Sequence, residues 1–148
     1  WAQPGLESRH NRQYWHNRPF FGFGAGAFGA MCGVRYWNVR PVRLYIERIL
    51  SGEDAGRYPF SPALEGFEEI TRRIEMSETA FLGLRLVREG LSRAAFAARF
   101  GESLDAVFGD TFTVLERQGL IAHDGDCLRL TERAYLISNQ VFSRLLLD

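Results

Sequence analysis

The second part of the chain has apolar side chains at helical spacing. Residues 61–87 carry them three and four positions apart, which predicts one long helix with a Ser-Pro start. The same spacing predicts helices over 91–101 and 103–118, each ended by a glycine. An Asp-Gly turn inside 120–130 predicts a β-hairpin, and Thr131 with Glu132 begins a final helix. The expected inward positions of the 103–118 helix are Leu104, Val107, Phe108, Phe112 and Leu115.

The first part of the chain mixes strand and helix patterns. Residues 7–15 predict a short helix with His10 and Tyr14 on one face. Aromatic residues alternate with glycine over 20–27, and β-formers fill 34–39. The sequence therefore predicts two strands joined by a turn near Cys32.

A further helix is expected after Pro41, which suits the first helical position, and Gly52 ends it. Its apolar residues repeat at i, i+3, i+4 and i+7, so we expect this face to lie in the core. The polar, glycine-containing stretch 53–60 then marks a linker. We predict an α+β, mainly helical fold with one domain over 1–52 and a second over 61–148.

The segment 20–33 has no charged residue and contains five glycines. Glycine lets a ligand or another segment approach the backbone closely, so we interpret this stretch as the wall of a site. Its Gly24–Gly29 match to G-x-G-x-x-G lacks the following helix and the acidic residue that a dinucleotide-binding fold requires. A Rossmann site is therefore not expected.

Composition narrows the class of protein further. No apolar run approaches the roughly 20 residues that cross a bilayer, so no transmembrane segment is expected. Cys32 and Cys127 are expected to be buried free thiols in a reducing, cytoplasmic setting. His10 and His16 are six positions apart, which does not place two ligands on one helical face, so no metal site is predicted.

Charge is distributed unevenly although the net charge is zero. Arginine is in excess before residue 60 and acidic residues are in excess after it, so the first part suits an acidic ligand or attracts the second part. The layout expected for 61–148 is three helices, a hairpin and a final helix. This is the layout of a winged helix, whose third helix, here 103–118, would enter a DNA groove. That helix carries Asp105, Asp110 and Glu116, which repel phosphate. We therefore expect a packing module that binds no nucleic acid, with a DNA- or protein-binding winged helix as the alternative.

Five motifs in order resemble the C-terminal part of radical-SAM proteins of the oxygen-independent coproporphyrinogen III oxidase-like family. The first of them is similar to the haem-chaperone branch of that family. The motifs are Ser8-Arg9-His10-Asn11-x-x-Tyr14-Trp15, Gly22-Phe23-Gly24-Ala25-Gly26-Ala27, Arg35-Tyr36-Trp37-Asn38, Leu82-Gly83-Leu84-Arg85-Leu86 and Leu128-Arg129-Leu130-Thr131-Glu132-Arg133.

The resemblance implies the hairpin edge of a truncated (β/α) barrel, followed by a helical, winged-helix-like domain that covers the site. The missing barrel would hold a [4Fe–4S] cluster on a cysteine triad that this chain lacks, with S-adenosylmethionine beside it. Residues Gly24, Ala25, Gly26 and Ala27 match the stretch that lies against S-adenosylmethionine in the family. The chain begins at Trp1 without an initiator methionine, which we interpret as a cut inside a longer protein.

Two functions follow from the resemblance. An oxidase would cleave S-adenosylmethionine reductively and convert two propionates of coproporphyrinogen III to vinyls, whereas a chaperone would bind haem and pass it on. His10 and Asn11 would then contact the tetrapyrrole or support the site, and Phe28 stands where the chaperone branch usually has histidine. We expect this chain alone to be inactive, and its exposed barrel edge to pair with the missing barrel or with another copy.

Overall fold

The structure is a computed structural model that describes residues 2–3 and 5–147 and contains two compact units. One unit, here called the helical unit, comprises the residues up to Arg18 and those from Arg72 onward. The other, the sheet unit, comprises Pro19–Thr71. The expected linker over 53–60 therefore lies inside the sheet unit, and the helix expected over 7–15 is part of the helical unit.

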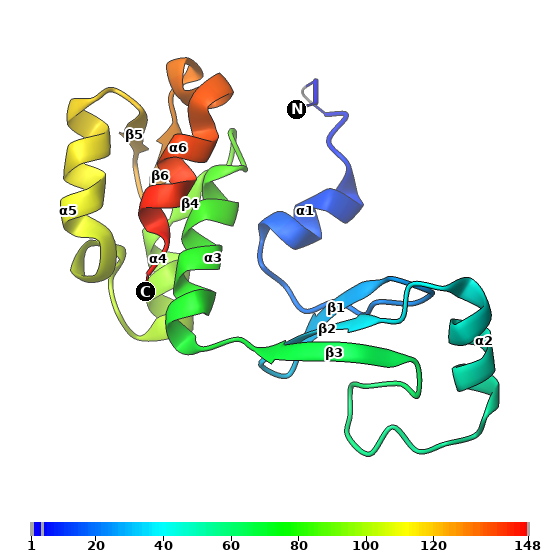
Figure 1. The fold of residues 1–148 in the computed structure, drawn as a ribbon. Coiled ribbons are helices and arrows are strands. Elements are labelled where there is room, and N and C mark those ends of the chain that lie inside the picture. The colour runs from blue at the N-terminus through cyan, green and yellow to red at the C-terminus, as the bar shows by residue number, and fades with distance from the viewer. Residues whose placement is uncertain (1, 4, 148) are drawn as a thin grey trace. The chain divides into compact units, whose positions relative to one another are not determined.

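The helical unit contains a small antiparallel sheet of strand order β4-β6-β5, beside which α3, α4, α5 and α6 lie (Figure 1). Its elements are α1 (Arg9–Trp15), α3 (Arg72–Leu84), β4 (Leu91–Ser92), α4 (Arg93–Phe100), α5 (Leu104–Arg117), β5 (Ile121–Asp124), β6 (Cys127–Leu130), the 3-10 helix η1 (Glu132–Ile137), α6 (Ser138–Phe142) and the 3-10 helix η2 (Ser143–Leu145). The predicted helices over 91–101 and 103–118 and the hairpin over 120–130 are confirmed.

The core of this unit forms from the positions that helical spacing points inward. Leu104, Phe108, Phe112 and Leu115 of α5 are each at most 2% exposed, and Val107 packs against this core. Phe96 of α4 lies against Phe108 with ring centroids 6.2 Å apart. Such burial of apolar area is the main stabilising contribution to a domain of this size.

Local capping explains where these helices begin. Ser92 and Ser103 each accept a hydrogen bond from the backbone N–H three residues on, which satisfies a donor that the first turn leaves free. The final helix differs from its prediction, because it is broken into η1, α6 and η2. Thr131 does not cap it, since its hydroxyl donates to Gly119 O at 2.7 Å instead.

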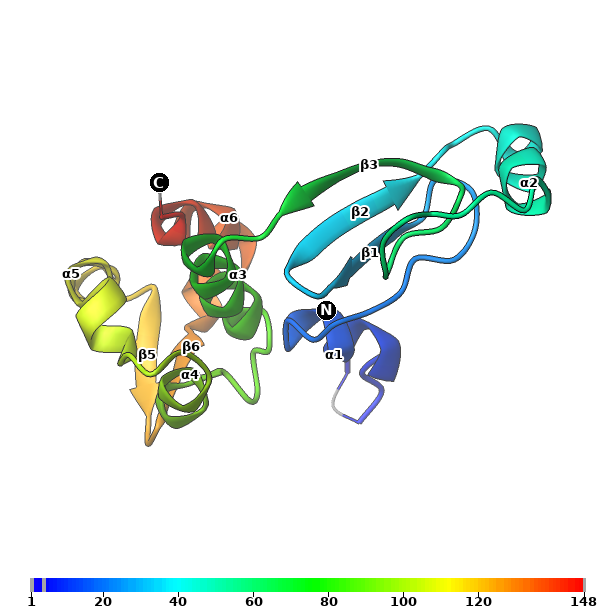
Figure 2. The same ribbon diagram turned by 90° about the horizontal axis from the view of Figure 1, so that it is seen from below.

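The sheet unit is built on three antiparallel strands in the order β1-β2-β3, as Figure 2 shows from below. They are β1 (Phe28–Met31), β2 (Val34–Asn38) and β3 (Leu64–Glu69), and the helix α2 (Val42–Leu50) follows β2. Cys32 and Gly33 turn the chain between β1 and β2 with φ of 54° and 74°. The predicted turn at Cys32 is confirmed, with Gly33 favoured because it tolerates positive φ without strain.

The long helix predicted over 61–87 is wrong in its first third. Residues Leu64–Glu69 form β3, which pairs with β2, and the helix begins only at Arg72. Gly66 lies under the Trp37 ring, where a Cβ would stand 2.7 Å from Cζ2. Arg35 and Glu68 form an ion pair across the strands at 2.7 Å. Pairing with β2 therefore overrides the local helical pattern.

The expectation that the apolar face of α2 is buried is also wrong. Val42, Ile46 and Leu50 are 64%, 50% and 78% exposed, and no residue of α2 is buried. Figures 1 and 2 show the reason, since α2 lies beyond the end of the sheet and does not cross its face. The helix is thus amphipathic with an uncovered apolar face. Among the described residues no helix combines the length and apolar character that crossing a bilayer requires.

The core assignment predicts the response of two leucines to truncation. Leu115 is 0% exposed, so Leu115→Ala should lower the free energy of unfolding by about 2–5 kcal/mol through lost burial and a cavity. Leu136 in the same unit is 95% exposed, so Leu136→Ala should change it by no more than about 0.5 kcal/mol. Denaturant unfolding of both variants measures this, and equal effects would contradict the assigned core.

Candidate functional site

The strand predicted over 20–27 is not formed. Only Phe20 pairs, through hydrogen bonds with Ala30 of 2.8 and 2.9 Å, and residues 21–27 form a loop that we call the glycine loop. Gly24 and Gly26 have φ of 104° and 68°, conformations that side chains with a Cβ rarely adopt. The two glycines therefore turn the backbone out of the extended form.

A buried asparagine holds the glycine loop in place. The side-chain amide of Asn38, which is 2% exposed, donates to Gly22 O at 3.1 Å and to Gly24 O at 3.0 Å. Its Oδ1 accepts a hydrogen bond from Ser61 Oγ at 3.4 Å. Both amide hydrogens and the oxygen of Asn38 are thus used, as burial of an amide requires.

The glycines of this region divide into two kinds. A Cβ at Gly22 would lie 2.3 Å from Phe28 O, and one at Gly29 would lie 2.2 Å from Tyr36 Cζ, so these two glycines make room for neighbouring atoms. A Cβ at Gly24 would meet nothing within 4 Å, and at Gly26 the nearest atom is Arg40 Cγ at 3.6 Å. The predicted site residues Gly24, Ala25, Gly26 and Ala27 are half-buried and carry almost no side chain. The space where a Cβ would stand is therefore open at Gly24, whereas at Gly26 it is in ordinary van der Waals contact with Arg40.

The other predicted site residues, His10 and Asn11, lie on α1 in the helical unit. His10 is exposed, with its Nε2 3.0 Å from the Tyr14 hydroxyl and the two rings edge to face. The predicted shared face of His10 and Tyr14 is therefore confirmed. Neither His10 nor Asn11 caps the helix, because Ser8 accepts the hydrogen bond from Asn11 N–H.

A glutamate in the loop after α3 anchors α1. Glu89 pairs with Arg12 and, through Oε2, with His16 Nε2 at 3.3 Å. Asn17 adds a hydrogen bond of 3.1 Å to Thr79 Oγ1 on α3. Burial lowers the pKa of His16 below 6.5, and this effect outweighs the opposing attraction of Glu89. No sequence spacing signals Glu89, since its partners lie far away along the chain.

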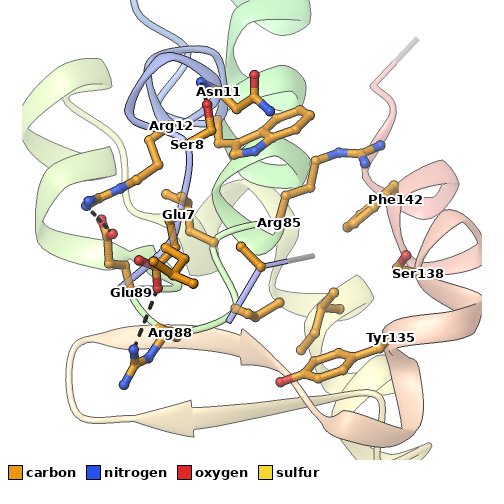
Figure 3. Close-up of a pocket in the computed structure, with 16 residues that line it drawn as sticks. Glu7, Ser8, Asn11, Arg12, Arg85, Arg88, Glu89, Tyr135, Ser138 and Phe142 are labelled. Atoms are coloured by element: carbon orange, nitrogen blue, oxygen red, sulfur yellow. Dashed lines mark hydrogen bonds and ion pairs between the residues drawn. The ribbon is translucent and has the colours of Figure 1, made fainter. Parts of the chain in front are cut away.

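A pocket of about 600 Å³ lies within the helical unit beside α1 (Figure 3). Its walls come from α1 and the residues just before it, from the segment 85–89 after α3, and from Leu130, Tyr135, Ser138 and Phe142. Asn11 contributes to the wall, and Arg85 projects between two aromatic rings, with Cζ 5.2 Å from the Trp15 centroid and 4.5 Å from that of Phe142. Arg85 belongs to the motif Leu82-Gly83-Leu84-Arg85-Leu86 but is not among the site residues predicted from the sequence. A single arginine in an apolar run resembles a solvated one until the rings around it are known.

The cysteines differ from their prediction. Cys32 is exposed at the tip of the β1–β2 turn, and Cys127 is half-buried in β6. Cys32 is exposed because the turn that its positive φ allows projects beyond the paired strands. Within residues 2–3 and 5–147 no three His, Cys, Asp or Glu side chains converge in a way that would hold a metal ion.

Removing the Asn38 amide should loosen the glycine loop. Asn38→Ala leaves the Gly22 and Gly24 carbonyls without these donors, so the free energy of unfolding should fall by about 1–3 kcal/mol. Exchange of the Gly26 N–H, which donates to Val39 O, should become faster. The exposed Asn139 provides the control variant Asn139→Ala, for which neither change is expected. Unchanged exchange at Gly26 in Asn38→Ala would contradict the role of the amide.

His16 should make the free energy of unfolding of the helical unit depend on pH. Because its pKa is lower in the folded state, the unfolded chain binds the proton more readily just below pH 6.5. The free energy of unfolding of the parent protein, relative to His16→Gln, should therefore fall as the pH decreases below about 6.5 and stay level above pH 7. Urea titrations across this range measure the difference. A parent protein that gained stability over the variant on acidification would show that attraction to Glu89 dominates.

Comparison with known proteins matches part of the chain to a protein family and nearly all of it to individual proteins. Residues 70–137 match the family model described as the HemN C-terminal domain. A solved structure titled "Coproporphyrinogen III oxidase (HemN) from Escherichia coli is a Radical SAM enzyme" superposes with a TM-score of 0.63 over 87% of this chain and 28% of that one. The sequence identity is 14%, so this likeness shows the fold alone.

Curated relatives match nearly the whole chain. The heme chaperone HemW of Bacillus subtilis is 39% identical over 145 residues, which are 98% of this chain and 36% of that protein. HemW of Lactococcus lactis is 32% identical over 98% of this chain and 35% of its own length. HemW of Mycobacterium tuberculosis is 35% identical over 99% and 33% respectively.

The chain thus spans about a third of the length of these relatives. Together the comparisons confirm the family resemblance that the five sequence motifs carry, and the names of the curated relatives agree with the haem-chaperone branch that the first motif indicates. Residues 70–137 thus match the HemN C-terminal domain family, and nearly the whole chain is similar to about a third of the HemW haem chaperones.

Proposed function

We propose that this chain is the C-terminal part of a radical-SAM protein that binds haem and passes it on. The relatives that match it over nearly its whole length are named haem chaperones, at 32–39% identity. The oxidase structure is related at 14% identity, which supports a shared fold and not a shared reaction. This contrast favours the chaperone over the coproporphyrinogen III oxidase.

The proposal depends on one observation, that the imidazole of His10 is exposed and oriented by a neighbouring side chain. Of the three histidines, His16 pairs with Glu89 and His123 pairs with Glu116. His10 forms no ion pair among the described residues; it is exposed, and the Tyr14 hydroxyl orients its ring. Imidazole is a common axial ligand of haem iron, and a hydrogen bond to its ring is the usual way to fix its direction.

Phe28 cannot replace His10 as a ligand. Its side chain is 49% exposed and packs on the Trp37 ring with centroids 5.8 Å apart, but it has no donor atom for iron. We therefore assign haem coordination to His10, with Asn11 in a supporting position on the same helix.

In the longer protein we propose that Gly24, Ala25, Gly26 and Ala27 contact S-adenosylmethionine. The open backbone of the glycine loop fits a nucleoside, because no side chain stands in front of Gly24. A [4Fe–4S] cluster in the longer protein would supply the electron that cleaves S-adenosylmethionine. The two cysteines of this sequence cannot provide three thiolate ligands, so residues outside the sequence would hold a [4Fe–4S] cluster.

The uncovered apolar face of α2 supports the idea of a preceding barrel. Val42, Ile46, Ile49 and Leu50 are 40–78% exposed, and a large exposed apolar patch usually marks an interface. We propose that the barrel covers this face in the longer protein. A second copy of the chain would compete for the same face when the barrel is absent.

We further propose that α3, α4, α5 and the β5–β6 hairpin act as a winged-helix-like packing module. The order of helices and strands and the three-stranded β4-β6-β5 sheet support this. Asp105 and Glu116 of α5 disfavour the alternative of DNA binding, since both repel phosphate. Salt-dependent binding of duplex DNA would favour that alternative.

Haem titration tests the role of His10. His10→Ala should weaken haem binding by at least about tenfold and alter the Soret band, because an iron ligand is lost. His123→Ala removes a histidine of an exposed ion pair and should bind haem as the parent does. Equal affinity and equal spectra for His10→Ala and the parent would overturn the assignment.

A further inference from the structure

The pocket beside α1 combines apolar walls with charged side chains. Leu86, Leu130 and Phe142 contribute apolar surface and are at most 8% exposed. Three arginines, Arg12, Arg85 and Arg88, line the same space. Its volume of about 600 Å³ lies within the usual range for small-molecule sites.

Two of these arginines are neutralised by carboxylates. Arg12 pairs with Glu89, and Arg88 pairs with Glu7 at 3.6 Å, as the dashed lines of Figure 3 mark. Arg85 differs from both. Among the described residues no hydrogen bond or ion pair is made by its guanidinium, which Figure 3 shows directed toward Phe142 and away from Glu89.

The aromatic rings explain how an unpaired arginine is held there. Trp15 and Phe142 lie 5.2 and 4.5 Å from Arg85 Cζ, and cation–π contact stabilises the charge over a ring face. Burial against the rings lowers the pKa of Arg85, which means that the charge has lost part of its hydration. Arg85 as a residue is still exposed, so the rings cover it only in part.

This geometry selects a carboxylate. A guanidinium fork can bind a carboxylate with two parallel hydrogen bonds, and the two rings next to Arg85 favour a ligand with an apolar body. A partly dehydrated cation gains more from such a pair than one in open water.

We propose that Arg85 and this pocket bind a carboxylate carried on an apolar body. This inference rests on the proposed function for the identity of the ligand: the carboxylate is a propionate of the tetrapyrrole. Arg85 and His10 then have separate tasks, since the arginine recognises the propionate and the histidine recognises the iron.

Metal-free protoporphyrin IX and its dimethyl ester separate the two tasks. The ester keeps the ring and removes the carboxylate charge, and neither compound contains iron. By porphyrin fluorescence titration, the 148-residue chain should bind the diacid about tenfold or more tightly than the ester. Arg85→Gln should bind both compounds with similar affinity, because the substitution weakens binding of the diacid and leaves binding of the ester unchanged.

Three further variants complete the test. Arg117→Gln removes the same charge from an exposed position on α5 outside the pocket and should keep the preference for the diacid. Arg85→Lys retains the charge without the fork and should lose most of the preference while folding as the parent does, which circular dichroism checks. His10→Ala should keep the preference, because no iron is present.

A parent chain without preference for the diacid, or Arg85 variants that keep it, would overturn the inference. Failure of the proposed function would appear differently, as iron haem binding that His10→Ala leaves unchanged while the diacid preference persists.

Discussion

The sheet unit depends on one buried amide. Asn38 lies at the end of β2, where the pairing with β3 shifts its register, and joins three segments of the chain. Its side chain binds the carbonyls of Gly22 and Gly24, its backbone N–H donates to Ala27 O, and its oxygen accepts from Ser61. An amide can do this because it carries two donors and an acceptor in one plane. The open backbone of the glycine loop is a consequence of that arrangement.

In the helical unit an exposed carboxylate, that of Glu89, holds α1 in position. Glu89 holds Arg12 and His16 of the α1 region, and α1 carries the imidazole of His10 on one side and the pocket residues Asn11 and Trp15 on another. A short helix is marginal in water by itself, so its position depends on such contacts with α3 and the following loop. The placement of α1, and with it of His10, therefore depends on these polar contacts, since α1 has no buried residue.

Helical periodicity and capping residues were sufficient to predict α4 and α5 from the sequence. The Asp-Gly turn was sufficient to predict the β5–β6 hairpin. In these segments, residues such as Ser103 and Phe108 encode both the local structure and the core position. The strand β3 was not predictable in this way, because its pairing depends on Gly66 fitting under Trp37 from another strand. The apolar pattern of α2 was found correctly, but periodicity shows that a face is apolar and not whether this chain covers it. Arg85 was missed because its aromatic partners lie far from it in sequence.

The sequence also indicated the glycine stretch as a site wall, and the structure adds the reason that Gly24 and Gly26 differ from Gly22 and Gly29. We propose that the loop held by Asn38 receives a nucleoside-bearing cofactor along its backbone. A crystal structure of the longer protein with S-adenosylmethionine bound tests this most directly. The account predicts that the nucleoside lies in van der Waals contact with Gly24–Ala27. A cofactor bound elsewhere, with the glycine loop in contact with protein alone, would contradict it.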